Sequence, residues 1–238
     1  MRYRTLGGTG IQVSTYCLGT MMLGAWGNPD HDEGVGIIQA ALDAGINFVD
    51  TADVYSQGES EVIVGKALAG GRRDDVVLAS KVHMPMGEER NQRGNSRRWI
   101  TREVENSLQR LDTDWIDLYQ IHRYDPDTDL DETLGALTDL VRAGKIRYLG
   151  HPTFAVSAIV EAQWTARDRG RTVRDRTAAV LDSQPRHRKR RPSHVRTARN
   201  GCHLLQPPRR WMAIRPLPQG RRSPGTGFGG QATTGQPF

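Results

Sequence analysis

The sequence predicts an α/β fold in which parallel strands alternate with helices. Three short apolar runs carry this prediction, because each ends abruptly in an ionisable residue and helical patterns separate one run from the next. The runs are residues 46–49 before Asp50, residues 76–80 before Lys81, and residues 115–121 before His122. When parallel strands close into a (β/α)8 barrel of the TIM type, their C-terminal ends meet at one face, where active sites lie. The 238 residues of the chain are enough for such a barrel, which has about 250 residues.

The N-terminal residues predict a hairpin that leads into the first strand of the sheet. Residues 2–6 and 11–15 alternate polar and apolar side chains on either side of the glycine-rich residues 7–10, a pattern typical of a β-hairpin. Residues 17–21 follow as the first strand, and Gly19 within it lets the backbone approach a bound ring closely.

A helix is expected from about residue 32 to residue 44. Val35, Ile38 and Leu42 recur at spacings of three and four residues, which places them on one helical face. Gly45 then ends the helix, because glycine readily adopts the left-handed conformation of a C-terminal cap.

After the second strand, Ser60 is a candidate N-cap for a helix that carries Ile63 and Leu68 on its apolar face. The third strand is followed by a long polar loop, residues 82–98, with glycines at positions 87 and 94. A loop of that length in a compact domain is usually functional, so we expect a wall or lid over the mouth of the barrel.

The remaining pattern supplies the helix that follows the third strand and then two more strand and helix pairs. Apolar residues at helical spacing are Ile100, Val104, Leu108 and Leu111, then Leu130, Leu134, Leu137 and Leu140, and finally Val156, Ile159, Val160 and Trp164. Residues 145–149 form a fifth strand, and the last helix starts near Thr153. About five strand and helix units are therefore recognisable, fewer than the eight that close a barrel.

The chain changes character near residue 170. Residues 171–238 hold 15 Lys and Arg residues but only 2 Asp and Glu residues, and 8 of the 12 prolines lie there. This stretch lacks apolar runs of helical or strand period, so we expect it to be disordered. The sequence thus divides into a partial barrel at residues 1–170 and an Arg-, Pro- and Gly-rich tail at residues 171–238.

A change of reading frame near residues 166–174 is one explanation of the tail. Arginine accounts for 29 of the 33 basic residues, which indicates a gene rich in G and C. Reading such a gene out of frame yields Arg, Pro and Gly in abundance. A genuine arginine-rich extension is the alternative.

Cysteine usage and hydropathy exclude several classes of protein. Cys17 and Cys202 are the two cysteines, without a CxxC motif or a His-rich partner, so neither a disulfide framework nor a metal site is expected. No run of about 18 apolar residues occurs, at the N-terminus or elsewhere. We therefore expect a cytoplasmic protein without membrane insertion.

Four polar residues occur in the order of the catalytic residues of the aldo-keto reductases, and the sequence resembles that family. They are Asp50, Tyr55, Lys81 and His122. Supporting phrases occupy residues 45–52, 58–61 and 144–150, and residues 3–7 and 92–96 are most similar to the branch that includes potassium-channel beta subunits and their soluble bacterial relatives. The resemblance covers roughly residues 1–170.

The resemblance implies NADPH-dependent reduction of aldehydes or ketones to alcohols. Hydride transfer to a carbonyl carbon needs a proton donor at the oxygen, and Tyr55 is expected to be that donor. A neighbouring ammonium favours the phenolate, so Lys81 would tune Tyr55 while Asp50 holds Lys81 charged and in place. His122 would donate a hydrogen bond to the carbonyl oxygen and orient it.

Cofactor contacts are also implied by the resemblance. The residues expected near the nicotinamide ribose are Gly19, Thr20, Met21 and Asp50. In the family, a serine and a following polar residue after the fifth strand bind the carboxamide, and these positions are Pro152 and Thr153 here. Proline has neither a side-chain donor nor a backbone N–H, so of these two positions only Thr153 is expected to bind the cofactor. The phosphate-binding loops of later strands are not recognisable.

Other interpretations remain open. Asp50 and Lys81 are also compatible with a structural ion pair, and Tyr55 and His122 with packing roles, so the inference rests on their conjunction. A second interpretation is that the chain is a truncated or frameshifted, inactive fragment of such an enzyme. A third alternative is nucleic-acid binding by the basic residues 186–191. The sequence favours no particular carbonyl substrate and no particular oligomeric state.

Overall fold

The computed structural model describes residues 1–152, 154–168 and 181–182. Six parallel strands form one sheet in the order of the sequence, and an antiparallel hairpin stands apart from it. The sheet consists of β3 (Leu18–Gly19), β4 (Phe48–Asp50), β5 (Val77–Val82), β6 (Ile116–Ile121), β7 (Ile146–His151) and β8 (Leu181–Asp182). The hairpin consists of β1 (Tyr3–Thr5) and β2 (Gln12–Ser14), as predicted.

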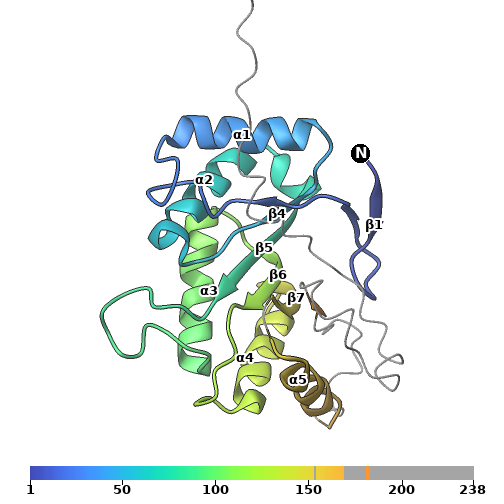
Figure 1. Cartoon of the computed structure of the whole chain (residues 1–238), viewed down its shortest axis with the longest axis vertical. Helices are drawn as coiled ribbons and strands as arrows, with labels where there is room; N and C mark the ends of the chain where they lie inside the picture. Colours follow the sequence, from blue (N-terminus) through green and yellow to red (C-terminus); the bar gives the residue numbers. More distant parts are fainter. Residues whose placement is uncertain (153, 169–180, 183–238) are drawn as a thin grey trace, which may run out of the picture. The chain divides into compact units, whose positions relative to one another are not determined.

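A helix connects each strand of the sheet to the next. The helices are α1 (His31–Asp43), α2 (Glu59–Leu68), α3 (Arg97–Leu111), α4 (Leu130–Arg142) and α5 (Val156–Asp168), and two short 3₁₀ turns, η1 (Tyr55–Gly58) and η2 (Arg72–Asp75), flank α2. Each helix packs against the next one in sequence, so the helices form a layer along one side of the strands (Figure 1). This arrangement confirms an α/β fold with parallel strands.

The strand residues alternate between the two faces of the sheet. One face packs against the hairpin segment, and its cluster contains Leu6, Val13, Phe48, Val77, Ala79 and Leu118. The other face lies among the helices, with Val49, Leu78, Tyr119 and Leu149 in the main core. Because successive side chains of a strand point to opposite faces, Asp50, Lys81 and Gln120 share the face of Phe48, Ala79 and Leu118.

The sheet is open in the described part of the chain. Among these residues no pairing joins β3 to β8. The two residues of β8 lie within the stretch in which the sequence predicts no strand, and there the structure differs from that expectation. Leu181 and Asp182 pair in parallel with Gly150 and His151, because an edge strand such as β7 presents a row of backbone donors and acceptors. Apart from residues 181–182, the stretch predicted to be disordered lies outside the described residues, and so does the predicted change of reading frame from residue 169 onward.

The structure corrects two predictions about helices. Ser60 is not an N-cap, since α2 begins at Glu59 with Gly58 as its cap. The Ser60 hydroxyl instead donates to the carbonyl oxygen of Thr20 at 2.9 Å, which ties α2 to the end of β3. In α5 the predicted apolar stripe is wrong in part, because Val160 and Trp164 are exposed.

The predicted end of α1 is confirmed. Gly45 has a φ of 90°, a left-handed conformation that costs glycine little. The backbone N–H of Ile46 then donates to the carbonyl oxygen of Ala41 at 3.1 Å and closes the helix end.

None of the helices that the structure describes is both long and apolar enough to cross a membrane.

Replacing Gly65 by alanine is expected to destabilise the fold. A Cβ at Gly65 of α2 would lie 2.7 Å from the carbonyl oxygen of Leu111 at the end of α3, too close for the two helices to keep their spacing. We expect Gly65→Ala to lower the free energy of unfolding by about 1–3 kcal/mol, measured by urea denaturation.

Gly36 is the matched control. It is exposed on α1, and a Cβ there would meet no atom within 4 Å, so Gly36→Ala is expected to be neutral or to stabilise by about 0.5–1 kcal/mol. Equal effects of the two substitutions would contradict the close approach of α2 and α3.

Candidate active site

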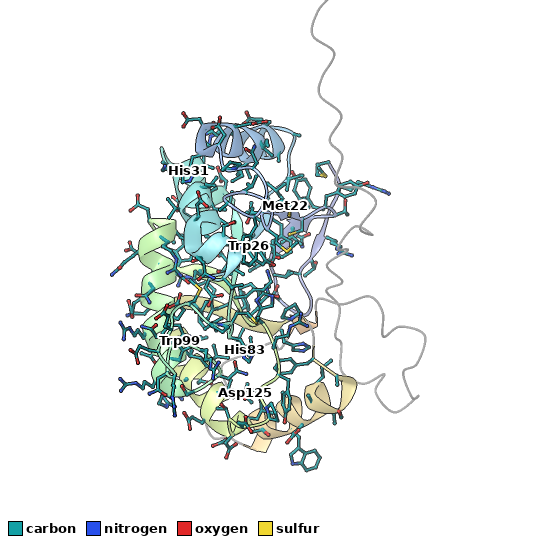
Figure 2. The ribbon with its side chains drawn as sticks, turned by 60° about the vertical axis from the view of Figure 1, so that its left-hand side comes forward. Met22, Trp26, His31, His83, Trp99 and Asp125 are labelled. Carbon is teal, nitrogen blue, oxygen red and sulfur yellow. The ribbon has the colours of Figure 1, made fainter. Side chains whose placement is uncertain are left out.

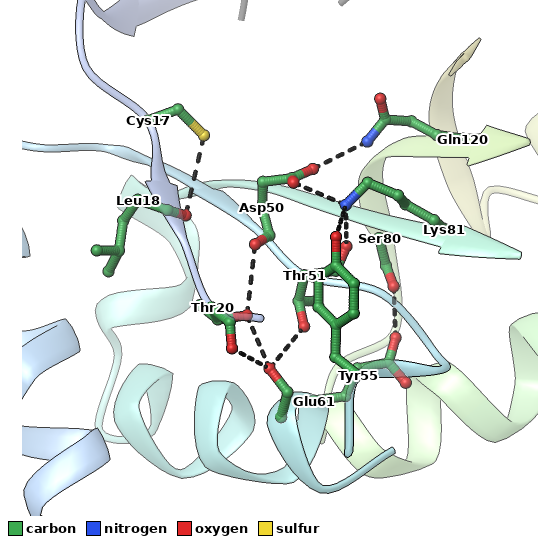
Figure 3. Close-up of polar contacts among 11 residues, drawn as sticks. Cys17, Leu18, Thr20, Asp50, Thr51, Tyr55, Glu61, Ser80, Lys81 and Gln120 are labelled. Carbon is green, nitrogen blue, oxygen red and sulfur yellow. Dashed lines mark hydrogen bonds and ion pairs between the residues drawn. The ribbon is translucent and has the colours of Figure 1, made fainter. Parts of the chain in front are cut away.

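The side chain of Lys81 is the centre of a hydrogen-bonded group at the C-terminal ends of β4 and β5. Its Nζ donates to Asp50 Oδ2 at 2.7 Å, to the carbonyl oxygen of Thr51 at 2.8 Å, and to the hydroxyl oxygen of Tyr55 at 3.1 Å (Figure 3). The Lys81 side chain is only 2% exposed. The ammonium therefore has a partner for each of its three protons and is almost closed off from solvent.

The sheet register places these groups. Asp50 is the last residue of β4 and lies opposite Ala79, two residues before Lys81 on the same face of β5. Tyr55 comes from the turn that follows β4, and this turn is held to β5 by a 3.2 Å hydrogen bond from the backbone N–H of Asp53 to the carbonyl oxygen of Lys81. One strand end and one turn thus bring the carboxylate and the phenol to the same ammonium.

The turn after Tyr55 has a strained backbone. Ser56 and Gln57 have φ values of 49° and 56°, a left-handed conformation that is unfavourable for residues other than glycine. Such strain costs of order 1–3 kcal/mol per residue and persists only where the surroundings enforce it, often at functional sites.

Gln120 is a member of the site that the sequence analysis missed. Its Nε2 donates to Asp50 Oδ1 at 3.0 Å, so both oxygens of Asp50 are used, one by Gln120 and one by Lys81. Gln120 is fully buried and lies opposite Lys81 in the register of β5 and β6. A signal was present in the sequence, because Gln120 is a polar residue two positions before His122, on the same face of an apolar strand.

The charge of Lys81 is secured by its partners. Burial alone lowers the pKa of Lys81, but the charge of Asp50 and the contact with Tyr55 outweigh burial and raise that pKa above its ordinary value. Lys81 is therefore an ammonium over the whole physiological pH range. The same Nζ lies 4.8 Å from the centre of the Tyr55 ring, so the charge faces both the hydroxyl and the ring.

His122 follows directly after β6 and faces Tyr55. The two rings meet edge to face with centroids 6.0 Å apart, and the backbone N–H of His122 donates to the carbonyl oxygen of Val82 at 2.9 Å. Burial, reinforced by the positive charge of Lys81, lowers the pKa of His122 to about 3. The imidazole is therefore neutral at neutral pH and carries one N–H donor.

A second aromatic side chain lies beside Tyr55 and was also missed. The Trp26 ring is 6.3 Å from the Tyr55 ring and is 48% exposed (Figure 2). The loop that carries it is fixed to the other side of the turn, because the N–H of Trp26 donates to Ser56 Oγ at 3.0 Å. The N–H of Ala25 likewise donates to Glu59 Oε2 at 2.7 Å. Nothing local in the sequence links residues 24–26 to residues 56–59.

The long polar loop after β5 is anchored by Asn95. The Asn95 amide contacts His83 Nδ1 at 3.0 Å and donates to the carbonyl oxygen of Arg123 at 3.0 Å, and its backbone carbonyl oxygen accepts from Thr133 Oγ1 at 3.0 Å. The N–H of Asn95 also donates to Asp125 Oδ2 at 3.2 Å. The buried residue Asn95 thus holds His83 through its side chain and Asp125 through its backbone N–H; His83 and Asp125 are labelled in Figure 2.

The residues predicted to contact a cofactor differ in their surroundings. Gly19 is exposed at the end of β3, and a Cβ there would meet no atom within 4 Å, so the space beside its backbone is open. Met21 is 40% exposed. Thr20 is fully buried, and its hydroxyl lies 2.8 Å from that of Ser60. Pro152 is buried, and Thr153 lies outside the described residues.

Metal chemistry has no obvious ligands in the described part of the chain. There, no group of three or more His, Cys, Asp or Glu side chains is placed to hold a metal ion.

A comparison with protein families places this geometry in a known context. The model of the family described as "Aldo/keto reductase family" matches residues 16–177. The chain belongs to the aldo/keto reductase family. The matched residues include Lys81 with its partners Asp50 and Tyr55, here called the Lys81 group, as well as Gln120 and His122. The family predicted from the residues at the strand ends is confirmed.

Individual relatives agree with this assignment. The aldo-keto reductase YhdN of Bacillus subtilis (strain 168) is 44% identical over 159 residues, which cover 66% of this chain and 48% of that relative. The uncharacterized oxidoreductase YrpG of the same organism is 43% identical over 179 residues, 71% of this chain and 54% of the relative. A probable voltage-gated potassium channel subunit beta of Arabidopsis thaliana is 38% identical over 175 residues, 71% of this chain and 51% of the relative, which confirms the predicted branch.

The chain spans about half the length of these relatives.

The Lys81 and Asp50 side chains are expected to be strongly coupled. Lys81→Met leaves Asp50 without its cation, and Asp50→Asn leaves a buried ammonium without its counter-charge, so each is expected to lower the free energy of unfolding by about 3–5 kcal/mol. The double variant is expected to cost less than the sum of the two, with a coupling of about 1–3 kcal/mol. Urea denaturation of the four proteins measures this cycle.

The matched control is the surface pair Arg72 and Asp43. Its N–O distance is 2.8 Å, but the two side chains are 40% and 63% exposed. The corresponding cycle is expected to give a coupling below about 1 kcal/mol. If both pairs coupled equally, burial would not be the source of the Lys81 and Asp50 interaction.

His122 is expected to make the fold sensitive to acid. Its pKa is lowered to about 3 in the folded protein from an unfolded value near 6.5, so the unfolded chain binds the proton first as pH falls. The stability lost between these values is up to about 5 kcal/mol, at about 1.4 kcal/mol per pH unit. In His122→Gln, the free energy of unfolding should fall less steeply between about pH 6.5 and pH 4. Identical slopes for the two proteins would contradict the neutral, buried imidazole.

Proposed function

We propose that the chain carries the catalytic end of an NADPH-dependent aldo-keto reductase, which reduces aldehydes or ketones to alcohols. The observation that carries the proposal is the single ammonium of Lys81, which contacts both Asp50 and the hydroxyl of Tyr55. We further propose that the described sheet is part of a (β/α)8 barrel, because its strands are parallel, follow the sequence order and present their polar residues at their C-terminal ends.

Tyr55 is the proton donor in this proposal. When NADPH is bound, it supplies the hydride that a carbonyl carbon needs, and the oxygen must then gain a proton. The Tyr55 hydroxyl gives that proton, and the ammonium of Lys81 stabilises the phenolate that remains. Asp50 keeps Lys81 charged, and Gln120 holds Asp50 from its other oxygen.

His122 orients the carbonyl group. Its neutral imidazole carries one N–H donor and lies with its ring 6.0 Å from that of Tyr55, so a carbonyl oxygen between them can accept from both. A neutral donor suits this role, because it binds the oxygen without competing with Tyr55 as an acid at neutral pH.

The described residues fit the nicotinamide end of the cofactor. Gly19 offers open space beside its backbone, Met21 offers an exposed apolar side chain, and Asp50 lies beside them at the end of β4. The hydroxyl and N–H of Thr20 both contact the carbonyl oxygen of Asp50, so we propose that Thr20 acts by fixing Asp50. Thr153 is proposed as a carboxamide contact next to Pro152, which has no N–H to offer.

We propose that the substrate is a small carbonyl compound and that the protein works in the cytoplasm. The exposed Trp26 ring beside Tyr55 supplies an apolar wall for such a molecule. The names of two relatives, an aldo-keto reductase and an uncharacterized oxidoreductase, support a carbonyl substrate.

An inactive fragment is the alternative. It is favoured by a specific observation, since the chain covers about half of each relative and the family match ends at residue 177. A fragment would keep the Lys81 group but hold NADPH weakly, because barrel phosphate sites lie after the seventh and eighth strands.

Tyr55→Phe tests the proposal. Removing the proton donor is expected to lower kcat for aldehyde reduction by about 10²–10⁴-fold while NADPH binding, followed by quenching of NADPH fluorescence, stays unchanged. The control is Tyr124→Phe, an exposed tyrosine that should leave kcat within about twofold.

Two outcomes decide between the alternatives. Full activity in the Tyr55→Phe protein would refute Tyr55 as the donor. Absence of both NADPH quenching and turnover in the unchanged chain would favour the inactive fragment.

A further inference from the structure

A second polar group lies directly behind the active site, between the sheet and the helices. Its members come from the turn after β4, from α2 and α3, and from the helix-facing positions of β5 and β6; they are Asp53, Glu61, Ser80, Glu103, Arg110 and Tyr119. All except Arg110 are fully buried. Such a group is costly unless its charges are compensated and its hydrogen bonds are made.

Arg110 is the cation of this group and is already shared by two carboxylates. Its Nε donates to Glu61 Oε2 at 2.7 Å, and its Nη2 donates to Glu103 Oε1 at 2.6 Å. Ser80 Oγ donates to the remaining oxygen of Glu61 at 2.5 Å (Figure 3). The positive charge of Arg110 therefore compensates the carboxylates of Glu61 and Glu103.

Asp53 is the third carboxyl of the group and has no cation of its own among the described residues. Its Oδ1 accepts from the N–H of Val54 at 2.6 Å, but its Oδ2 is buried and makes no hydrogen bond with the described residues. The hydroxyl of Tyr119 is also buried and makes no hydrogen bond with the described residues. A carboxylate here would face Glu61 and Glu103 in a medium of low polarity, which disfavours the ionised form.

The pKa shifts of Asp53 and Tyr119 also disfavour an ionised Asp53 side chain. Burial, followed by the negative charges of Glu61 and Glu103, raises the pKa of Asp53 well above its usual value, and Arg110 opposes this only weakly. Burial and the charge of Asp53 likewise raise the pKa of the Tyr119 hydroxyl. A proton on Asp53 Oδ2 would turn this oxygen into a donor and remove the charge that acts on Tyr119.

The group is joined to the catalytic residues through the backbone. Ser80 precedes Lys81, Tyr119 precedes Gln120, and Asp53 lies two residues before Tyr55. The N–H of Asp53 donates to the carbonyl oxygen of Lys81 at 3.2 Å, and the N–H of Tyr55 donates to that of Ala52 at 3.2 Å. These hydrogen bonds, with the one from the N–H of Val54 to Asp53 Oδ1, tie Asp53 to the turn that holds Tyr55.

We propose that Asp53 is a positioning residue that stays protonated behind the sheet and thereby fixes the turn that carries Tyr55 against β5. The protonated state stands independently of any catalytic activity, whereas the effect on turnover rests on the proposed reductase function. Asp53 touches neither substrate nor cofactor in this proposal and acts through the position of Tyr55.

Asp53→Asn tests the protonated state, because asparagine has the shape of the neutral carboxyl. The folded protein keeps a proton that the unfolded chain releases above the ordinary carboxyl pKa of about 3.9, so the contribution of Asp53 to stability falls as pH rises from about 4 upward. Above about pH 6.5, where His122 is neutral in both the folded and the unfolded chain, this contribution is no longer opposed by that of His122. The Asn variant removes the Asp53 contribution, so its urea midpoint at about pH 8 is expected to be equal or higher, and its dependence on pH between about pH 6.5 and pH 8 flatter.

The control is Asp74→Asn, an exposed position in η2, which should leave the pH dependence unchanged. A difference infrared spectrum of the unchanged chain and the Asp53→Asn protein should show the C=O band of a carboxylic acid. A carboxylate band, or a lower midpoint for Asp53→Asn at about pH 8, would overturn the protonated state.

The positioning role is read from the ring signals of ¹³C-labelled tyrosine, with the Tyr55 signal assigned by Tyr55→Phe. Asp53→Ala is expected to shift the Tyr55 signal, whereas Asp53→Asn should leave it in place. Turnover should follow the same order, with a loss of at least about tenfold in kcat for Asp53→Ala and less than about threefold for Asp53→Asn.

These measurements separate the two proposals. A chain without turnover whose Tyr55 signal still responds in this order refutes the reductase function and retains Asp53 as a positioning residue. A Tyr55 signal that is unchanged in Asp53→Ala overturns the positioning role, whether or not the chain is active.

Discussion

The contact between the ammonium of Lys81 and the carboxylate of Asp50 is the constraint on which the site depends. A lysine that is 2% exposed is tolerated only because each of its protons has an acceptor within the protein. Those acceptors come from the end of β4 and from the turn that follows it, so the strand register and the turn must both be correct before the charge can be buried. The fold thereby fixes the phenol of Tyr55 at a defined distance from a permanent positive charge.

The same strands serve two polar groups, one on each face of the sheet. Because side chains alternate along a strand, each residue on the face of Lys81 and Gln120 is followed or preceded by a residue that faces the helices. Lys81 is thus adjacent to Ser80, and Gln120 is adjacent to Tyr119. The backbone of β5 and β6 is held between two sets of hydrogen bonds and ion pairs, which limits how far Lys81 and Gln120 can move.

Site residues with a local sequence signal could be predicted, whereas those placed by tertiary contacts could not. Asp50, Lys81 and His122 could be predicted because each directly follows an apolar run. Trp26 and Asn95 could not, since their partners lie tens of residues away and no periodicity links them. Ser60 has a residue type that is typical of an N-cap, but its hydroxyl donates to the carbonyl oxygen of Thr20 instead. The stripe of α5 was visible in the spacing, yet spacing does not reveal whether anything covers Trp164.

Asn95 has a consequence for how this protein can change over evolution. The contact between Asn95 and His83 closes residues 84–94 into a loop. Met84 and Met86 of this loop pack against the cluster that contains Tyr55, whereas residues 87–94 are mostly exposed. The entropy of closing a loop grows only slowly with its length, so insertions there should be tolerated without moving the neighbouring imidazole. The loop could then diversify while the hydrogen-bonded group around Lys81 stays constant, provided that the asparagine itself is kept.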